Sequence, residues 1–268
     1  MAEAQSATGW NGGTIRDGAI CVLAGNPGVM TLDGTNTWLV YAPGEDRAVA
    51  IDPGPDDDMH LHAVLHAARQ HGLQIVQVLL THGHLDHSAG ARRFAELTGS
   101  AVRAVSSEFT TGAAPLVPGE VVEAGSLQLH VVPAPGHTGD SVCFSAPALR
   151  ALFTGDTVLG RGTTVVAHPD GQLGPYLASL ARLRDLAELT GVELILPGHG
   201  PVVSQPLQVL DGYIAHRKAR LEQVREAVAA GAHSAREVVE RVYADVDRSL
   251  WPAAELSVEA QLAYLGPE

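Results

Sequence analysis

The chain has 268 residues, which is enough for one large domain or for one medium domain with a small appendage. Hydrophobic residues make up 46% of it and charged residues 18%, so it is not a disordered chain, and no apolar run approaches the roughly 18 residues that a membrane-spanning helix needs. The net charge of −13 and the aromatic content of 4% disfavour general binding to polyanions and stacking on single-stranded nucleic acid.

The amino-terminal segment MAEAQSATGWNGGT has neither a basic part nor an apolar part of the kind that forms a secretory signal. Cys21 and Cys143 each lie inside an apolar run, with no other cysteine or histidine at metal-ligand spacing, and are expected to be buried and unpaired. We therefore expect a cytoplasmic protein without a membrane-embedded part.

Runs of apolar or alternating residues bounded by Gly, Pro, Asn or Asp predict strands along the first 200 residues. These strands are expected at residues 18–25, 34–42, 47–54, 74–80, 101–105, 120–125, 126–132, 141–146, 151–155 and 192–196. Helical patterns occur at residues 57–71, 88–97 and 174–188. Strands in two batches, with helices between and after them, predict a mixed sheet whose outer faces are covered by helices.

After residue 205 the pattern becomes helical throughout. Three helices are expected at residues 206–230, 234–243 and 253–265, with Gly231 and the pair Trp251-Pro252 as breaks. We therefore expect two domains, a larger one at residues 1–205 and a small helical one at residues 206–268.

Four residues of metal-ligand type lie within six positions of the segment THGHLDHSAG, directly after the predicted strand 74–80. Alternate residues of an extended segment point the same way, so His82 and His84 can converge on one ion. As the loop bends into the next helix, Asp86 and His87 can turn toward a second ion. The spacing therefore predicts two adjacent metal sites.

Three later strand ends carry one further candidate ligand each. His137 lies in PAPGHTGDS, Asp156 in FTGDT and His199 in LPGHGP. In all three a strand leads into a turn that contains glycine, which lets a side chain or the backbone come close to an ion. Each residue alone is a weak candidate, but together they supply the ligands that two ions need.

The motifs HxHxDH, GHT, GD and GHG, in this order over residues 18–203, make the chain resemble the metallo-β-lactamase superfamily. The resemblance implies a four-layer αβ/βα sandwich with a binuclear zinc centre at one edge. It implies that one metal is bound by His82, His84 and His137, the other by Asp86, His87 and His199, and that Asp156 bridges the two. We also count Asp86 as catalytic, because its replacement by alanine is expected to abolish hydrolysis.

Imidazole and carboxylate ligands without thiolate fit two zinc ions, and also manganese or iron. Two ions about 3.5–4 Å apart share a hydroxide that attacks the substrate, and they polarise its carbonyl or phosphoryl oxygen. The predicted reaction is therefore hydrolysis. Asp52, in IDPG, lies where this family places a carboxylate that orients a metal ligand, although an aspartate before proline also forms turns.

The remaining histidines are expected to be mostly structural. His60, His62 and His66 lie on the predicted helix 57–71 without a carboxylate or a glycine turn at the spacing of the metal motif, so we expect surface or packing roles. His168, in VVAHPDGQLGPY, differs because its loop is expected to border the metal edge. It is a possible contact of the substrate.

The tail of the chain resembles the winged-helix-like carboxy-terminal domain of lactamase-β-2-like hydrolases, a group that includes thioesterases and single-strand endoribonucleases. Glyoxalase II, which has the same ligand set, is a neighbouring family. Asp156 and His199 are 43 positions apart, which leaves no room for the inserted domain of the β-CASP nucleases. The acidic charge and few aromatics favour a zinc-dependent hydrolase of a thioester or similar small acyl substrate.

The sequence favours no oligomeric state. Two other hypotheses about the function remain at this stage. The first is a single-strand endoribonuclease, because Arg217, Lys218 and Arg220 cluster on one helical turn and could contact phosphates. The alternative for these three residues is a solvated helix face. The second is a nucleic-acid-binding module without catalysis, which leaves the complete ligand set without a purpose.

Overall fold

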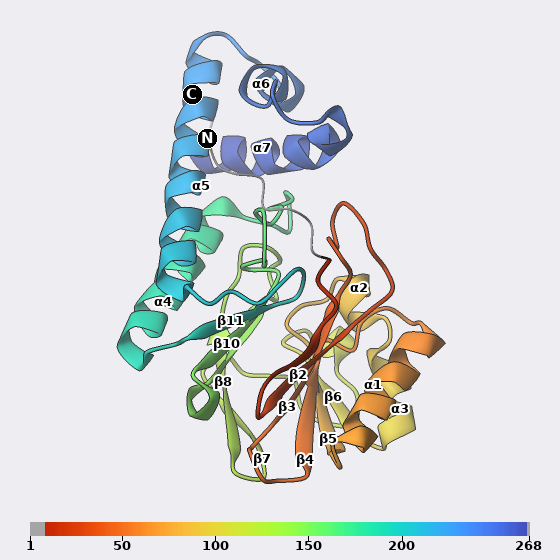
Figure 1. The fold of residues 1–268 in the computed structure, drawn as a ribbon. Helices are drawn as coiled ribbons and strands as arrows, with labels where there is room; N and C mark the ends of the chain where they lie inside the picture. Colours follow the sequence, from red (N-terminus) through yellow and green to blue (C-terminus); the bar gives the residue numbers. More distant parts are fainter. Residues whose placement is uncertain (1–8, 267–268) are drawn as a thin grey trace.

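The computed structural model describes residues 9–266 of the chain. Residues 1–8, on which the expectation of no secretory signal partly rests, lie outside the described residues. Two β sheets face each other, helices cover the outer face of each sheet, and a helical region lies beyond one end of the sandwich (Figure 1). The expected four-layer αβ/βα arrangement is therefore confirmed.

The first sheet has six strands in the order β1-β2-β3-β4-β5-β6. The strands are β1 (Gly13–Arg16), β2 (Ala19–Leu23), β3 (Asn36–Tyr41), β4 (Arg47–Ile51), β5 (Gln74–Leu79) and β6 (Ala101–Arg103). Neighbours are antiparallel from β1 to β4 and parallel from β4 to β6, so the sheet is mixed. The edge strand β1 was not predicted, because a short, partly exposed strand has little apolar alternation to reveal it.

Helices α1 (Asp58–Gln70), α2 (Leu85–Ser88) and α3 (Ala91–Thr98) belong to this half of the molecule. Asp57 caps α1, because its side chain accepts a hydrogen bond from the His60 N–H at 3.1 Å. The helix expected at residues 88–97 is present as α3, which begins three residues later than expected, at Ala91. The chain turns between α2 and α3, where Gly90 passes so close to the backbone that a Cβ would lie 2.7 Å from the Pro55 carbonyl oxygen.

The second sheet has five strands in the order β11-β10-β9-β8-β7. The strands are β7 (Val121–Ala124), β8 (Leu127–Pro133), β9 (Val142–Ala146), β10 (Ala151–Gly155) and β11 (Leu194–Pro197). Helices α4 (Leu173–Thr190) and α5 (Pro206–Ala229) cover its outer face. All of these strands and both helices follow the sequence prediction within a few residues.

Three apolar layers hold the sandwich together. Between the sheets, the rings of Trp38 and Phe153 meet edge to face with centroids 5.8 Å apart. Leu61 and Phe94 belong to the layer between the first sheet and its helices, and Tyr176 to the layer between the second sheet and α4. Cys21 and Cys143 are buried and free, as expected.

The carboxy-terminal region consists of the far end of α5, α6 (Ala235–Val242) and α7 (Trp251–Leu265) around a separate apolar cluster that includes Val224, Val238 and Trp251. The pair Trp251-Pro252 begins α7 instead of preceding it, because proline fits the first helical turn, where its missing N–H is not needed. Three short 3-10 turns lie at Ser107–Phe109, Pro147–Leu149 and Arg248–Leu250. Among residues 9–266, no helix is both long and apolar enough to cross a bilayer.

Strand direction brings five strand ends to one edge of the sandwich. In the first sheet, β4 and β5 are parallel. In the second, β8 and β10 are both antiparallel to β9, and β10 is parallel to β11, so all three run the same way. The two sheets are joined there by hydrogen bonds from the Asn36 N–H to the Gly198 carbonyl oxygen, 2.7 Å, and from Trp38 Nε1 to the Pro197 carbonyl oxygen, 3.0 Å. Side chains that follow these strands must meet.

Candidate metal centre

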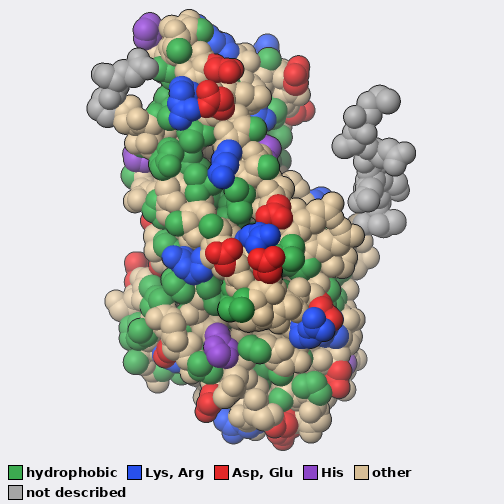
Figure 2. All heavy atoms as spheres, turned by 90° about the vertical axis from the view of Figure 1, so that its left-hand side faces the viewer, with side chains coloured by type: hydrophobic (Ala, Val, Ile, Leu, Met, Phe, Trp, Pro, Cys, Tyr) green, Lys and Arg blue, Asp and Glu red, His purple; other side chains and the backbone are tan. Residues whose placement is uncertain are grey.

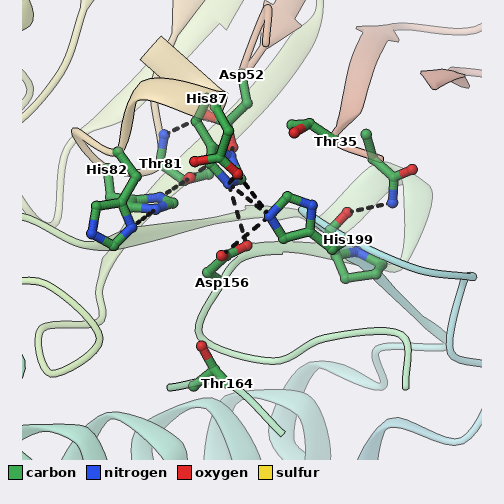
Figure 3. Close-up of polar contacts among 12 residues, drawn as sticks. Thr35, Asp52, Thr81, His82, His87, Asp156, Thr164 and His199 are labelled. Carbon is green, nitrogen blue, oxygen red and sulfur yellow. Dashed lines mark hydrogen bonds and ion pairs between the residues drawn. The ribbon is translucent and has the colours of Figure 1, made fainter. Parts of the chain in front are cut away.

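The segment after β5 supplies the first side chains of the site (Figure 3). His82 is buried, whereas His84 is exposed and is the N-cap of the one-turn helix α2. That turn rotates the chain, so that Asp86 lines the cavity described below and His87 is fully buried. The expected change from an extended segment to a helix within the motif is present.

Three imidazole nitrogens meet on one side of the site. His84 Nδ1 lies 3.0 Å from His82 Nε2 and 3.1 Å from His137 Nε2. His137 follows β8, so this group joins the two sheets. The three donor atoms lie within 4.8 Å of one another, which is the spacing of ligands around one ion.

A second group lies beside the first. His87 Nε2 and His199 Nε2 are 3.2 Å apart, and Asp86 Oδ2 lies 3.1 Å from His199 Nε2 and 3.4 Å from His87 Nε2. These three donor atoms also lie within 4.8 Å of one another. The structure thus brings together the two sets of three residues that the family resemblance implied.

Asp156, which follows β10, lies between the two groups (Figure 3). Its oxygens are 3.4 Å from His87 Nε2, 3.3 Å from His199 Nε2 and 3.8 Å from His137 Nε2. Asp156 Oδ1 is buried and has no hydrogen-bond partner among the described residues. A buried carboxylate oxygen without a partner is costly unless a cation binds it.

The far side of each ring shows which nitrogen is free to bind a metal. His137 Nδ1 lies 2.7 Å from the Val165 carbonyl oxygen, and His199 Nδ1 lies 3.0 Å from the Gly34 carbonyl oxygen. Because a carbonyl oxygen only accepts, both Nδ1 atoms carry the proton and donate it. The Nε2 lone pairs of these rings therefore face the centre, as a metal requires.

Asp52 holds His87 from behind. Its φ is +51°, which is unusual for a residue other than glycine, and its Oδ2 accepts a hydrogen bond from His87 Nδ1 at 2.9 Å. Thr81 fixes the carboxylate by donating from its N–H to Oδ1, 2.8 Å, and from its hydroxyl to Oδ2, 2.7 Å. Thr81 Oγ1 also accepts from His82 Nδ1 at 3.0 Å. One aspartate thus orients rings of both groups.

The electrostatics of the two groups of the cluster differ. Burial lowers the pKa of His82 and of His137, so both rings are neutral and can offer lone pairs. Burial also lowers the pKa of His87, but the carboxylates of Asp156 and Asp52 outweigh it and raise that pKa well above its ordinary value. Nitrogen and oxygen donors without thiolate fit zinc, manganese or iron, so these residues fit the expected metals.

Two glycines make room for the ligands. A Cβ on Gly198 would lie 2.6 Å from Asp156 Oδ1 and 2.7 Å from His87 Cε1, which is closer than side-chain atoms approach. A Cβ on Gly155, whose φ is +48°, would lie 2.4 Å from Thr81 Oγ1. The glycine turns of the sequence motifs are therefore needed for close approach.

A cavity of about 360 Å³ opens above the cluster. Besides cluster residues it is lined by apolar side chains from the segment between β2 and β3, from the segment after β10 and from the carboxy-terminal region: Val29, Met30, Leu32, Leu159, Val165 and Leu250. Val29 and Met30 are largely exposed. The carboxy-terminal region therefore forms part of the wall of this chain's own site.

His168 does not line this cavity. It is exposed and lines a separate pocket, against α4 and α7, with residues such as Leu173 and Tyr264. Its loop does border the site as expected, but through residues 159–165, which precede it. The contact of His168 with substrate stays a prediction without support from this placement.

The expected arginine cluster on α5 is not one surface. Arg217 is buried, with its side chain over the ring of Tyr176, whereas Lys218 is exposed. Arg220 is half-buried and stacks on Tyr243. Lys218 therefore does not share a face with the two arginines, and only Lys218 fits the alternative of a solvated helix face.

Several positioning residues were missed in the sequence. Thr81 holds Asp52, Asn36 donates from Nδ2 to the Pro197 and Gly200 carbonyl oxygens, and Thr164 Oγ1 lies 3.2 Å from His137 Nδ1. Threonine and asparagine are common in turns, so their type alone carries no signal. The position of Thr81 directly before the HxHxDH motif was the one available indication.

Comparison with known proteins agrees with this geometry. Residues 30–199 match the family model described as the metallo-beta-lactamase superfamily. Residues 234–266 match the model described as the beta-lactamase associated winged helix domain, although the described residues of that range form helices only. A crystal structure of a metallo-beta-lactamase family protein from Thermus thermophilus covers 94% of this chain and 94% of its own, with a TM-score of 0.77 and 21% identity.

Curated relatives include two of different length. The chain is 32% identical over 270 residues to the beta-lactamase-like protein 2 homolog of Drosophila melanogaster, covering 93% of this chain and 88% of that protein. It is 36% identical over 208 residues to the atrochrysone carboxyl ACP thioesterase of Aspergillus fumigatus, covering 76% of this chain. The match spans 62% of the length of that fungal relative.

Proposed function

Because the chain belongs to the metallo-β-lactamase superfamily, we propose that it is a metal-dependent hydrolase whose substrate is an acyl thioester or a similar small acyl compound. The observation that carries the proposal is the convergence of seven ligand-type side chains on one point of the sandwich edge. The rings of His137 and His199 turn their lone pairs to that point, because carbonyl oxygens hold their other nitrogens.

The proposed ligand sets follow the two groups of donor atoms. His82, His84 and His137 would hold one metal, and Asp86, His87 and His199 the other. Asp156 would bridge them, since its carboxylate lies within 3.8 Å of imidazole nitrogens of both groups. When bound, two such metals acidify a shared water and polarise the carbonyl oxygen of the substrate. Zinc is the proposed metal, with manganese or iron as the alternatives.

The protein's own contribution is to position these groups. Asp52 accepts from His87 Nδ1 and from Thr81, which keeps the His87 ring in one orientation without placing Asp52 in the cavity. Asp86 is the carboxylate of the cluster that is most open to the cavity, with 30% of its side chain exposed. It therefore lies where a substrate carbonyl must approach, and we propose it as catalytic as well as metal-binding.

The cavity wall supports an acyl substrate. Leu32, Leu159 and Leu250 present apolar surface above the cluster, and Arg161 at its edge is paired with Asp33. An RNA substrate needs a cationic track for its phosphates, and on the face of α4 and α5 the basic side chains are interspersed with acidic ones (Figure 2). The thioesterase named among the relatives agrees in reaction type.

The test is turnover by the purified protein after its metal content is measured. We expect metal-dependent cleavage of S-lactoylglutathione or of acyl-coenzyme A thioesters, none of a single-stranded RNA oligonucleotide, and loss of thioester cleavage in Asp86→Ala. Cleavage of RNA without turnover of any thioester would overturn the proposed substrate class. Binding of RNA without turnover of any substrate would overturn the proposal that the protein is an enzyme.

A further inference from the structure

A second pocket of about 220 Å³ adjoins the metal cavity. The two share Thr163, Thr164, Val165 and Leu250 in their walls, so one molecule can occupy both. The rest of the second pocket comes from α5 and from the carboxy-terminal region. Its titratable side chains are His216, Arg217, Arg220 and Tyr243, and no carboxylate side chain lines it.

Arg217 is a buried cation without a counter-ion. Its side chain is 7% exposed, and its guanidinium donates to the Thr164 carbonyl oxygen and lies over the Tyr176 ring, 5.1 Å from the centroid. Among the described residues, no carboxylate lies within 4.0 Å of it, and its Nε has no hydrogen-bond partner. By contrast, the similarly sheltered Arg103 is paired with Glu120 at 2.7 Å. A buried guanidinium with a free donor is costly unless an anion binds it.

Arg220 lies one helical turn further along α5 and repeats the pattern. It stacks on Tyr243 at 4.3 Å, and its Nη1 donates to the Val242 carbonyl oxygen and to Gln223 Oε1, both at 2.9 Å. Its Nε is buried and has no partner among residues 9–266. Two guanidinium groups, each held by aromatic and backbone contacts and each with an unused donor, thus line one pocket of a protein whose net charge is −13.

We propose that this pocket binds a carboxylate or phosphate group carried by the acyl substrate, while the scissile bond lies at the metal cluster. The inference rests on the proposed function and adds the class of substrate: an anionic thioester or ester. Thr164 sets the distance, because its carbonyl oxygen accepts from Arg217 and its hydroxyl lies 3.2 Å from His137 Nδ1. One substrate molecule can therefore reach both the arginines and the metal cluster.

RNA fits this pocket less well than a single anionic group. Lys218 faces solvent on another side of α5, so the two arginines do not continue into a basic track. Guanidinium groups bind carboxylate and phosphate oxygens through paired, charge-assisted hydrogen bonds, which suits one small anion between two arginines.

A matched pair of thioesters tests the proposal: the hexanoyl thioester of N-acetylcysteine carries a carboxylate near sulfur, and that of N-acetylcysteamine lacks it. We expect the metal-loaded protein to have the higher kcat/KM on the carboxylated thioester. In Arg220→Gln the ratio of the two kcat/KM values should fall about 10- to 100-fold. Lys218→Gln, an exposed neighbour outside the pocket, should keep the wild-type ratio. Arg220→Lys, which retains the charge, should keep part of the preference.

The proposed anion site would be overturned by an unchanged ratio of the two kcat/KM values in a folded Arg220→Gln protein. An equal fall of that ratio in Lys218→Gln would overturn it as well. If the wild type cleaves neither of these thioesters nor S-lactoylglutathione nor an acyl-coenzyme A thioester, the proposed function fails. Calorimetry with S-methylglutathione then tests the pocket separately. Binding that is lost in Arg220→Gln would support the anion site, and no binding to the wild type would overturn it. Displacement of S-methylglutathione by single-stranded RNA that is then cleaved would assign the pocket to RNA phosphates instead.

Discussion

Two segments of this molecule are rich in histidine and have opposite fates. MHLHAVLH forms the first turns of α1, where His60 is buried against Thr37, 2.8 Å from its hydroxyl, while His62 and His66 face solvent. HGHLDH follows β5 and delivers all of its ligand-type side chains to one point. Histidine content is similar in both segments, and the backbone conformation determines whether the imidazoles converge on one point.

The difference lies in how each segment meets the rest of the chain. A helix on the outside of a sheet spreads successive side chains around its axis, so the imidazoles of α1 point in different directions. A strand end that turns into one helical turn gathers them, and four other strand ends arrive at the same edge with Asp52, His137, Asp156 and His199. A metal site therefore follows from converging termini more than from local composition.

The largest expected effect sharpens this contrast at Asp86. Asp86→Ala removes a metal-ligand oxygen that lies 3.1 Å from His199 Nε2. We expect the rate of hydrolysis to fall at least about 1,000-fold and bound metal to be lost. The fold should persist in far-ultraviolet circular dichroism, because Asp86 lies in the one-turn helix α2 and not in the apolar layers. An unfolded variant would show that the cluster has a structural role, which is to hold the two sheets together, and not a catalytic one.

Next in size is the expected effect of Asp52→Asn. An asparagine keeps the shape of the side chain but weakens the charge-assisted hydrogen bond to His87 Nδ1, so metal affinity should fall about 10- to 100-fold. Competition with a chelator measures this affinity. Activity should return when excess metal is added, and a variant that stays inactive at full metal occupancy would give Asp52 a role beyond orientation.

His60 of α1 is expected to make the stability of the protein depend on pH. Burial lowers the pKa of His60 to about 4. Between that value and the ordinary pKa of about 6.5, the unfolded chain takes up a proton that the folded protein does not, so the folded state loses stability as pH falls. From pH 7 to pH 5, His60 alone should lower the free energy of unfolding by about 2 kcal/mol.

Urea unfolding of the wild type and of His60→Gln at the two pH values isolates this contribution. The stability difference between the two proteins should shrink on acidification. A difference that is independent of pH would show that folding does not lower the pKa of His60, and would remove the distinction between a packing imidazole and an exposed one.

The smallest expected effect is at His62. His62→Ala changes an exposed side chain of α1, so metal content and activity should match the wild type and the free energy of unfolding should change by no more than about 0.5 kcal/mol. Elemental analysis and urea unfolding test this. A fall in bound metal would show that His62 contributes to metal binding, so that the two histidine segments would not differ in this respect.

Most of the fold and the ligand-type residues could be predicted from sequence because both rest on local signals. Strands β2 to β11 show apolar runs bounded by turn residues, and the ligands follow strand ends in spaced motifs. What escaped prediction depends on distant atoms. Gly90, between α2 and α3, has no room for a Cβ because the Pro55 carbonyl oxygen lies beside it, and Arg217 is buried because α5 packs against the segment around Thr164.

The placement of side chains on helices was the least predictable part. One turn of α5 carries Arg217, Lys218 and Arg220, and the sequence treats them alike. Their fates differ because Tyr176 lies opposite the first, solvent lies opposite the second and Tyr243 lies opposite the third. Such differences depend on the docking of the carboxy-terminal region, which leaves no local pattern in the chain.

The arrangement of strand ends also bears on how the protein folds. β5 supplies the HxHxDH segment early in the chain, whereas His199 follows β11, more than a hundred residues later. Contacts between such distant residues form slowly, because a long loop must close before they are made. A nascent chain that has completed only the first sheet therefore has four of the seven ligand-type residues. The assembled cluster becomes a marker of the final docking of the two sheets, and refolding followed by a metal-sensitive signal should report that late step.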